Sequence, residues 1–143
     1  SGAESAVHAA RAKLGGELIS DGTVFWNSIR EQTHPFFQSS SSLWRLSLKS
    51  NSPPLKLLGQ QLIEWGGALR WLACSGEGMD TEENIIRPES ILAGGNATLF
   101  RSNENSDSAF HPPGLQMMKI YQRIKEKFDP VGIFNPGRMF REL

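Results

Sequence analysis

Apolar residues recur at helical spacing in three stretches of the chain. Over residues 3–14 they fall three and four positions apart and a glycine pair follows, which predicts an amphipathic helix with a left-handed cap. A second helix is expected to open near Asp21 or Thr23 and to stop before Pro35, because proline disfavours helix at the residue before it. The clearest helix is predicted over residues 115–128, with one apolar face formed by Leu115, Met118, Tyr121, Ile124 and Phe128.

The first of these helices is expected to start at residue one. Ser1 and Glu4 have the spacing of a capping box, in which each side chain binds a free backbone N–H of the first turn. Small domains seldom begin without a lead-in. We therefore expect this chain to be part of a longer one, cut just after a strand.

Two single strands are predicted from alternation and from β-type residues. In residues 43–49, Trp44, Leu46 and Leu48 alternate with polar residues, so one face of this strand is expected in the core and the other in water. Residues 97–101 form a second run of this kind.

A hairpin is predicted between these two strands. Residues 61–65 and 68–73 have strand character, and Gly66 and Gly67 between them can adopt the positive φ angles of a two-residue turn.

The remaining segments are expected to be short or irregular. Residues 55–58 are long enough for about one helical turn. Residues 75–83 are acidic and lack apolar periodicity, which predicts a solvated loop, and residues 89–93 follow as a short helix opened by Pro88 and closed by a glycine pair. Residues 101–108 are polar and are predicted to be mobile.

This order of elements predicts a single α+β domain over residues 1–143. Helices alternate with a strand, a hairpin and another strand, which favours an antiparallel sheet with helices on one face. With one strand placed before Ser1, the order approaches a ferredoxin-like sheet.

Composition narrows the functional classes. The chain has 143 residues, 38% of them hydrophobic, which is enough for a genuine core. Its 15 Lys and Arg balance 15 Asp and Glu, so nucleic acid is disfavoured as a partner. No apolar run approaches the roughly 18 residues that span a bilayer, which indicates a soluble chain. The single cysteine, Cys74, excludes an internal disulfide and favours a reducing compartment.

Residue patterns for metal, serine or phosphate chemistry are weak. His8, His34 and His111 are far apart in sequence and none has a second ligand three or four residues away, so no metal site is expected. Ser75 lacks the glycine of a nucleophile elbow. The glycine pairs lack the strand, spacing and helix of a phosphate-binding loop, and are interpreted as turns and caps.

The segment over residues 128–140 is the densest in turn residues. Pro136 and Gly137 fit the centre of a type II turn, which would hold the Asn135 amide and the Arg138 guanidinium at fixed positions. Such a pair suits recognition of a planar or anionic ligand group. The alternative is that this segment only closes the domain.

The same segment carries a family resemblance. The sequence FDPVGIFNPGRM resembles the C-terminal signature of FAD-linked oxidases of the vanillyl-alcohol oxidase type. Further segments are similar to the FAD-binding subunits of bacterial glycolate oxidases, and the likeness runs from about Ser1 to the end: LWRLSL at 43–48, EWGGALRWL at 64–72, GGNATLFR at 94–101 and FHP at 110–112.

The resemblance implies that residues 1–143 are the C-terminal cap domain of a longer flavoprotein subunit. The N-terminal FAD-binding domain of such subunits, with its glycine-rich pyrophosphate loop, is absent from this chain, so the fragment alone is not expected to retain FAD. The complete subunit would work with a second flavin subunit and an iron–sulfur subunit to oxidise glycolate to glyoxylate. Its location would be cytoplasmic, either free or peripheral to the inner membrane through the complex.

The resemblance also implies roles for three residues. Asn135 and Arg138 would face the flavin domain and bind the cofactor. Residues 25–31, FWNSIRE, resemble a segment of 2-hydroxy-acid dehydrogenases whose arginine meets the substrate carboxylate, which would be Arg30 here, with a spacing that departs by one residue. The alternative for Arg30 is a solvated helix residue. No catalytic residue is assigned, and the resemblance leaves open whether the hydroxy-acid chemistry takes place at this subunit or on the partner subunit.

A second function class stays open beside the oxidase. The chain could be a stand-alone ferredoxin-like module that binds a ligand or a partner protein without catalysis. Such a module should not leave an unpaired edge where a first strand belongs, because an open edge invites pairing with another chain.

Overall fold

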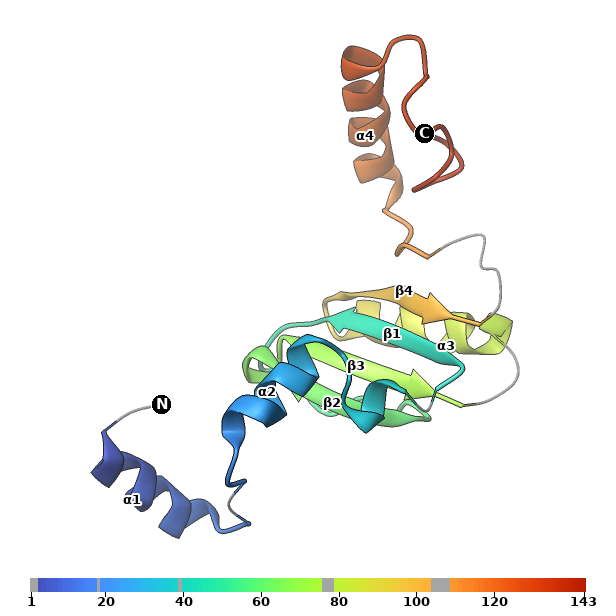
Figure 1. Cartoon of the computed structure of the whole chain (residues 1–143). Helices are drawn as coiled ribbons and strands as arrows, with labels where there is room; N and C mark the ends of the chain where they lie inside the picture. The colour runs from blue at the N-terminus through green and yellow to red at the C-terminus, as the bar shows by residue number, and fades with distance from the viewer. Residues whose placement is uncertain (1–2, 18, 39, 76–78, 104–108) are drawn as a thin grey trace. The chain divides into compact units, whose positions relative to one another are not determined.

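The computed structural model describes residues 3–17, 19–38, 40–75, 79–103 and 109–143, without the side chains of residues 79–82. The chain divides into two compact units, Ser1–His34 and Pro35–Leu143, which are treated separately below (Figure 1). No helix in the described part of the chain is long and apolar enough to cross a membrane.

The N-terminal unit contains two helices, α1 (Glu4–Leu14) and α2 (Gly22–Arg30). The predicted glycine cap of α1 is confirmed, because Gly15 has a φ of 67° and donates to Arg11 O. The expected start at residue one is wrong, since Ala3 is the N-cap and no side chain caps the helix; Ser1 lies outside the described residues. In α2, the Asp21 carboxylate accepts the Val24 N–H at 3.0 Å, which confirms the helix start near Asp21.

The second unit is built on a four-stranded antiparallel sheet. Its strands are β1 (Ser42–Ser47), β2 (Gln60–Glu64), β3 (Leu69–Cys74) and β4 (Asn96–Ser102), in the order β2-β3-β1-β4. The α+β class and the antiparallel pairing are confirmed. Since β1 and β2 both run antiparallel to β3, they point the same way, and a connection without helix joins them.

That connection corrects the helical turn expected at residues 55–58. The guanidinium of the buried Arg70 donates to the carbonyls of Pro53, at 2.8 Å, and of Ser52. Leu55 and Leu57 both pack on the core two residues apart, which is the spacing of an extended segment. The segment is therefore held by Arg70 and by burial of alternate side chains.

Helix α3 (Met79–Leu92) covers one face of the sheet (Figure 1). The core between them consists of Trp44, Leu46, Leu48, Leu57, Leu72, Cys74, Ile86, Ala97 and Leu99. The predicted burial of Trp44, Leu46 and Leu48 is thereby confirmed.

The expected start of this helix at residue 89 is wrong, and so is the loop expected over residues 79–83. Pro88 lies inside the helix rather than at its start. The helix continues through this proline because Ile86, Arg87 and Ser90 on its inner side are all buried, and Ser90 Oγ also donates to Ile86 O at 2.8 Å. Tertiary packing here outweighs the hydrogen bond that a proline removes.

Two glycine segments have the turn and cap roles predicted for them. Gly94 and Gly95 donate to Ile91 O and Ser90 O, which is the bond pattern of a Schellman cap at the end of α3. A Cβ at Gly95 would collide with the carbonyl of Ser47 on β1. The β2-β3 hairpin is confirmed, but its turn is longer than two residues.

The hairpin turn occupies residues 65–68, because Glu64 pairs with Leu69. Trp65, expected at the end of the strand, instead has a φ of 49° and a largely exposed side chain. Gly67 has a φ of 98°, and a Cβ there would lie 2.6 Å from Ser50 O. The close approach of the β1-β2 connection thus explains the longer turn.

The other face of the sheet carries an aromatic cluster. Phe37, of the short 3-10 helix η1 (Pro35–Phe37), is fully buried and packs edge to face on Trp71, which packs in the same way on Phe100. Both faces of the central strands are therefore covered. This explains why Leu43, which alternates with the core residues of β1, is also buried.

The last element is α4 (Leu115–Phe128), with the bounds that its apolar period predicted. None of its residues is buried. The polar segment expected to be mobile before it falls largely on residues 104–108, outside the described part of the chain.

Candidate functional site

The C-terminal loop is organised by one carboxylate. Asp129 directly follows α4 and is buried, and its two oxygens accept the backbone N–H groups of Ile133 and Phe134, each at 2.9 Å. Lys125, one helical turn earlier, lies with its Nζ 2.6 Å from Asp129 Oδ2 and also donates to the Phe134 carbonyl. The start of the loop is thus tied to the last turn of α4.

These contacts keep Asp129 ionised. The hydrogen bond from Lys125 is the main cause that lowers the pKa of Asp129 below its ordinary 3.8, and the two backbone N–H groups act in the same direction, while burial opposes them. At neutral pH the ionised Asp129 therefore holds the start of the loop to the end of α4.

The turn that holds Asn135 and Arg138 has the form expected from Pro136 and Gly137. The Arg138 N–H donates to Asn135 O at 3.2 Å, and Gly137 has a φ of 67°, the positive value that a type II turn requires at this position. Gly137 N–H also donates to the carbonyl of Leu143 at 2.5 Å. Asn135 and Arg138 are both exposed, so the turn presents an amide and a cation to the surroundings.

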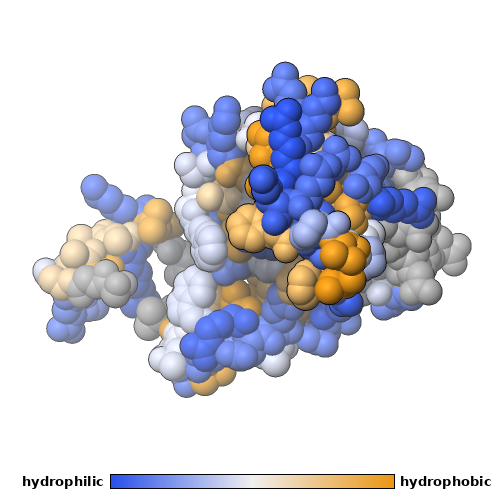
Figure 2. All heavy atoms as spheres, turned by 90° about the horizontal axis from the view of Figure 1, so that it is seen from above, coloured by the Kyte–Doolittle hydropathy of each residue, from blue (hydrophilic) through white to orange (hydrophobic). Residues whose placement is uncertain are grey.

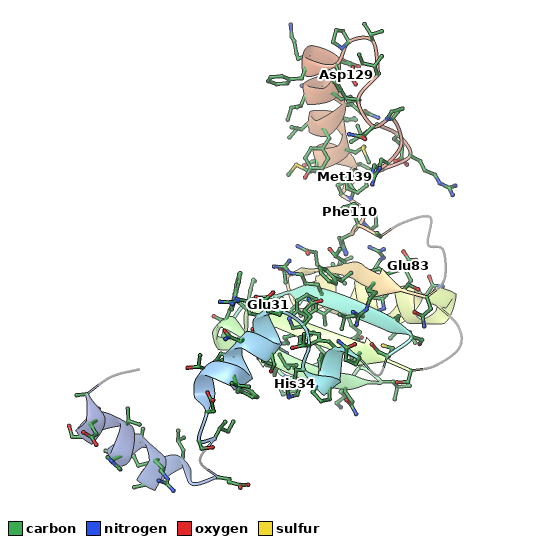
Figure 3. The ribbon with its side chains drawn as sticks, viewed as in Figure 1. Glu31, His34, Glu83, Phe110, Asp129 and Met139 are labelled. Carbon is green, nitrogen blue, oxygen red and sulfur yellow. The ribbon has the colours of Figure 1, made fainter. Side chains whose placement is uncertain are left out.

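A groove of about 390 Å³ runs between α4 and this loop. Figure 3 shows the loop leaving α4 at Asp129 and returning alongside it at Met139. The groove is lined by Tyr121, Ile124, Lys125, Phe128, Asp129, Phe134, Met139 and Leu143. Large apolar side chains around it are exposed, and Figure 2 shows apolar residues among strongly hydrophilic ones on the face seen from above.

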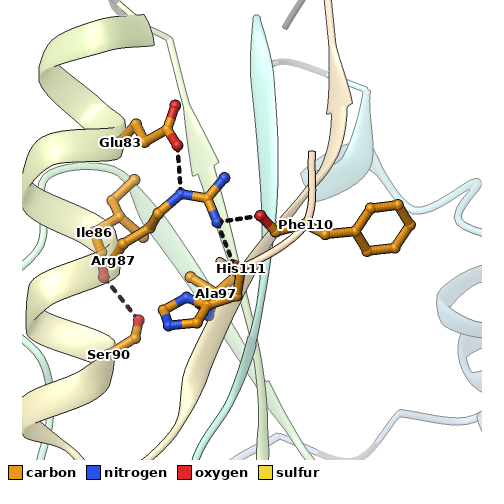
Figure 4. A network of polar contacts seen from close by, with 7 residues as sticks. All are labelled: Glu83, Ile86, Arg87, Ser90, Ala97, Phe110 and His111. Atoms are coloured by element: carbon orange, nitrogen blue, oxygen red, sulfur yellow. Dashed lines mark hydrogen bonds and ion pairs between the residues drawn. The ribbon is translucent and has the colours of Figure 1, made fainter. Parts of the chain in front are cut away.

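A second polar cluster anchors the segment before α4 to the sheet (Figure 4). The buried Arg87 of α3 is paired with Glu83 at 2.6 Å and donates to the carbonyls of Phe110, at 2.7 Å, and Ala97, at 3.3 Å. Its guanidinium also lies over the ring of Trp44, 5.4 Å from the centroid. Arg87 therefore joins α3, β4 and the Phe110 segment through one side chain.

His111 completes this cluster from the segment itself. Its Nδ1 accepts the Ala97 N–H at 3.3 Å, which requires the neutral imidazole. Burial and the neighbouring charge of Arg87 lower the pKa of His111 below 6.5.

Acidification is expected to release His111 from β4. With a pKa lowered in the folded state, the contact contributes fully above pH 6.5 and is lost as the pH falls through the lower folded value. Hydrogen exchange at the Ala97 amide, corrected for its intrinsic pH dependence, should accelerate in that range, and a His111→Asn variant should lack the step. An Ala97 exchange rate that does not change with pH would contradict this prediction.

The three residues with implied roles are placed in different units. Asn135 and Arg138 share one turn of the second unit. Arg30, at the end of α2 in the first unit, is largely exposed, and its Nε lies 2.8 Å from the Glu31 carboxylate.

Sequence reasoning did not assign roles to Asp129, Lys125, Arg87 or Glu83. The four-residue spacing of Lys125 and Asp129 at a predicted helix end was an available signal for the first pair. The pairing of Arg87 with Glu83 does not follow from the sequence, because residues 75–83 are expected to form a loop and the helix is expected to begin only at residue 89. Within the described residues, no three His, Cys, Asp or Glu side chains lie together as metal ligands would.

Comparison with known proteins gives one informative match. No family model matches the chain, and no solved structure matches it. The Escherichia coli (strain K12) protein named glycolate oxidase subunit GlcE is 44% identical to it over 142 residues. The chain is a homologue of this subunit, and the match covers 99% of the chain and 38% of the relative.

Proposed function

We propose that this homologue of glycolate oxidase subunit GlcE is the C-terminal cap domain of an FAD-binding glycolate oxidase subunit. The observation that supports the proposal is the 44% identity along 99% of the chain, which includes the turn that presents Asn135 and Arg138. The strand order β2-β3-β1-β4 is also the order of a ferredoxin-like sheet, here without a helix between β1 and β2.

The complete subunit would oxidise glycolate to glyoxylate together with a second flavin subunit and an iron–sulfur subunit in the cytoplasm. When bound, FAD supplies the acceptor for the two electrons that leave the hydroxy acid. The glycine pairs of this chain serve a hairpin turn and a helix cap, so the phosphate-binding loop would come from the flavin domain.

The residues of the turn fit one wall of a flavin site. Arg138 is an exposed cation on a turn in which Pro136 fixes one φ angle and Gly137 permits the positive φ that follows. Such a guanidinium can make a bidentate contact with the phosphates or with the pyrimidine end of the ring, and would stabilise negative charge there. The Asn135 amide, three residues away, can donate and accept at a ring edge.

Arg30 is the candidate partner for the substrate carboxylate. Its side chain is largely exposed at the end of α2, and Glu31 is its partner in the structure. Glu31 is bound at the Nε of that guanidinium, so the carboxylate of glycolate would bind at its terminal nitrogens or compete with Glu31.

Arg138→Ala in the full-length subunit is expected to lower FAD retention, because the flavin loses its fixed cation. In the isolated domain the same change should leave the melting temperature almost unchanged, since exposed charges contribute about 0–1 kcal/mol. The flavin absorbance that remains after gel filtration measures retention. Arg123→Ala, which removes another exposed cation from α4, is the matched control.

The isolated domain should be colourless when purified. A stoichiometric yellow chromophore retained by the fragment would overturn the proposal and indicate a complete flavoprotein. A full-length Arg138→Ala subunit with unchanged FAD content would show that the turn only closes the domain. If the full-length protein held no flavin at all, the stand-alone binding module would be the better description.

A further inference from the structure

The ion pair of Lys125 and Asp129 holds the backbone from which the Asn135 turn starts. We infer that Asp129 and Lys125 are positioning residues that set the place of Asn135 and Arg138 against the flavin, an inference that rests on the proposed function. The Asp129 carboxylate is buried against Lys125, so the pair would affect the flavin through the position of the loop.

Both backbone groups of Phe134 are bound by this pair. Its N–H donates to Asp129 Oδ2 at 2.9 Å, and its carbonyl accepts from Lys125 Nζ. Asn135 is the next residue, so the turn begins from a fixed peptide group. At its other side, Gly137 N–H is held by the Leu143 carbonyl. The turn is thus held on one side by the ion pair, through Phe134, and on the other by the Leu143 carbonyl.

Helix stability does not explain an aspartate at position 129. Asp129 is the C-cap of α4, where the helix dipole disfavours a negative charge. The N–H groups that it accepts belong to Ile133 and Phe134, beyond the helix. The residue type therefore serves the loop, and the cost of placing it there is offset by contacts that order the turn.

Within the described residues, Arg138 forms no ion pair, with Asp129 or with any other acidic side chain. Asp129 is engaged by Lys125 and by two backbone groups, so its charge is not directed at the turn. An exposed pair with this spacing would be expected to contribute little, whereas this carboxylate is buried and is bound by three donors. Removing the Asp129 carboxylate should therefore displace the turn and leave the charge of Arg138 unchanged.

The test measures FAD affinity of the full-length subunit by titrating the apoprotein with FAD. Asp129→Asn keeps the side-chain shape but removes the charge, and should raise the Kd for FAD about tenfold or more, the usual effect of losing a charge-assisted bond. Asp129→Glu, which can still accept two N–H groups and pair with Lys125, should restore part of the affinity. Lys125→Met should weaken binding as well, with Lys127→Met as the matched control on the exposed side of α4.

A double-mutant cycle separates positioning from general destabilisation. If Asp129 acts through the turn, Asp129→Asn should cause a smaller loss of FAD affinity in the Arg138→Ala subunit than in the unchanged subunit, because only the displacement of Asn135 remains. Full additivity would overturn the inference. So would unchanged FAD affinity in both Asp129→Asn and Lys125→Met while Arg138→Ala binds FAD weakly, and in that case the proposed function would stand. If Arg138→Ala alone has no effect, the proposed contact fails and the inference fails with it.

If Asp129→Asn does not fold, Lys125→Met decides the inference, because it removes the ion pair and leaves both backbone bonds of Asp129 in place. Its FAD affinity should fall, while its melting temperature in the isolated domain changes little. An affinity equal to that of Lys127→Met would contradict the inference.

Discussion

Replacing Leu46 with alanine is expected to lower the free energy of unfolding by about 2–5 kcal/mol, the usual range for a buried leucine truncated in a packed core. Leu46 lies on the central strand β1, is completely buried, and belongs to the cluster between the sheet and α3. The neighbouring elements are held by strand pairing on both sides, so they cannot collapse fully into the cavity. Urea unfolding followed by tryptophan fluorescence measures the loss.

Ser47→Ala is the control for this prediction. Ser47 is the next residue on the same strand and points to the opposite face, where it is only half-buried. Its replacement should change the free energy of unfolding by less than about 0.5 kcal/mol. Equal losses at positions 46 and 47 would contradict the face assignment of β1.

Arg87→Ala is expected to lower the free energy of unfolding by about 3 kcal/mol, the low end of the range for buried ion pairs, because the Glu83 side chain is 32% exposed and partly screened by water. The change leaves the carboxylate of Glu83 and the carbonyls of Ala97 and Phe110 without their donor, and it removes the cation over Trp44. Because Arg87 joins the Phe110 segment to α3, amide exchange should increase in that segment as well. Chemical unfolding together with hydrogen exchange checks both effects.

The double variant Glu83→Gln with Arg87→Met tests the reason for that loss. It removes both charges and keeps a long apolar side chain at position 87, so it should be more stable than Arg87→Ala. If the double variant is no more stable than Arg87→Ala, neither the orphaned charge nor lost packing explains the loss. The hydrogen bonds to the carbonyls of Ala97 and Phe110, which both variants lack, would then account for it.

Sequence reasoning located most of the sheet and the last helix because their signals are local. The alternation around Trp44 and Leu46 predicts which face of β1 is buried. The apolar period over residues 115–128 predicts α4. The first half of α3 was missed for the opposite reason. Its helix is held by Ile86, Arg87 and Ser90 packing on strands distant in sequence, and local propensity around Pro88 gave no sign of that.

In the candidate site, too, the locally determined part could be predicted and the part that depends on distant contacts could not. Pro136 fixes one backbone angle and Gly137 permits the positive φ of a type II turn, so the turn that presents Asn135 and Arg138 could be predicted. The role of Asp129 could not, because it depends on the chain folding back so that two amides reach one buried carboxylate. The hairpin turn was misjudged in length because Gly67 is constrained by Ser50, which lies in another segment.

Gly95 is required by the packing of the sheet and not by a reaction. Only hydrogen fits at that Cα, because the Ser47 carbonyl of the neighbouring strand occupies the space of a side chain. Any sheet in which the chain enters β4 this close to β1 needs glycine there, whatever reaction the protein performs. A glycine retained at this position therefore reports the packing of two strands and not a reaction. Exposed residues such as Asn135 and Arg138 are not fixed by packing in this way.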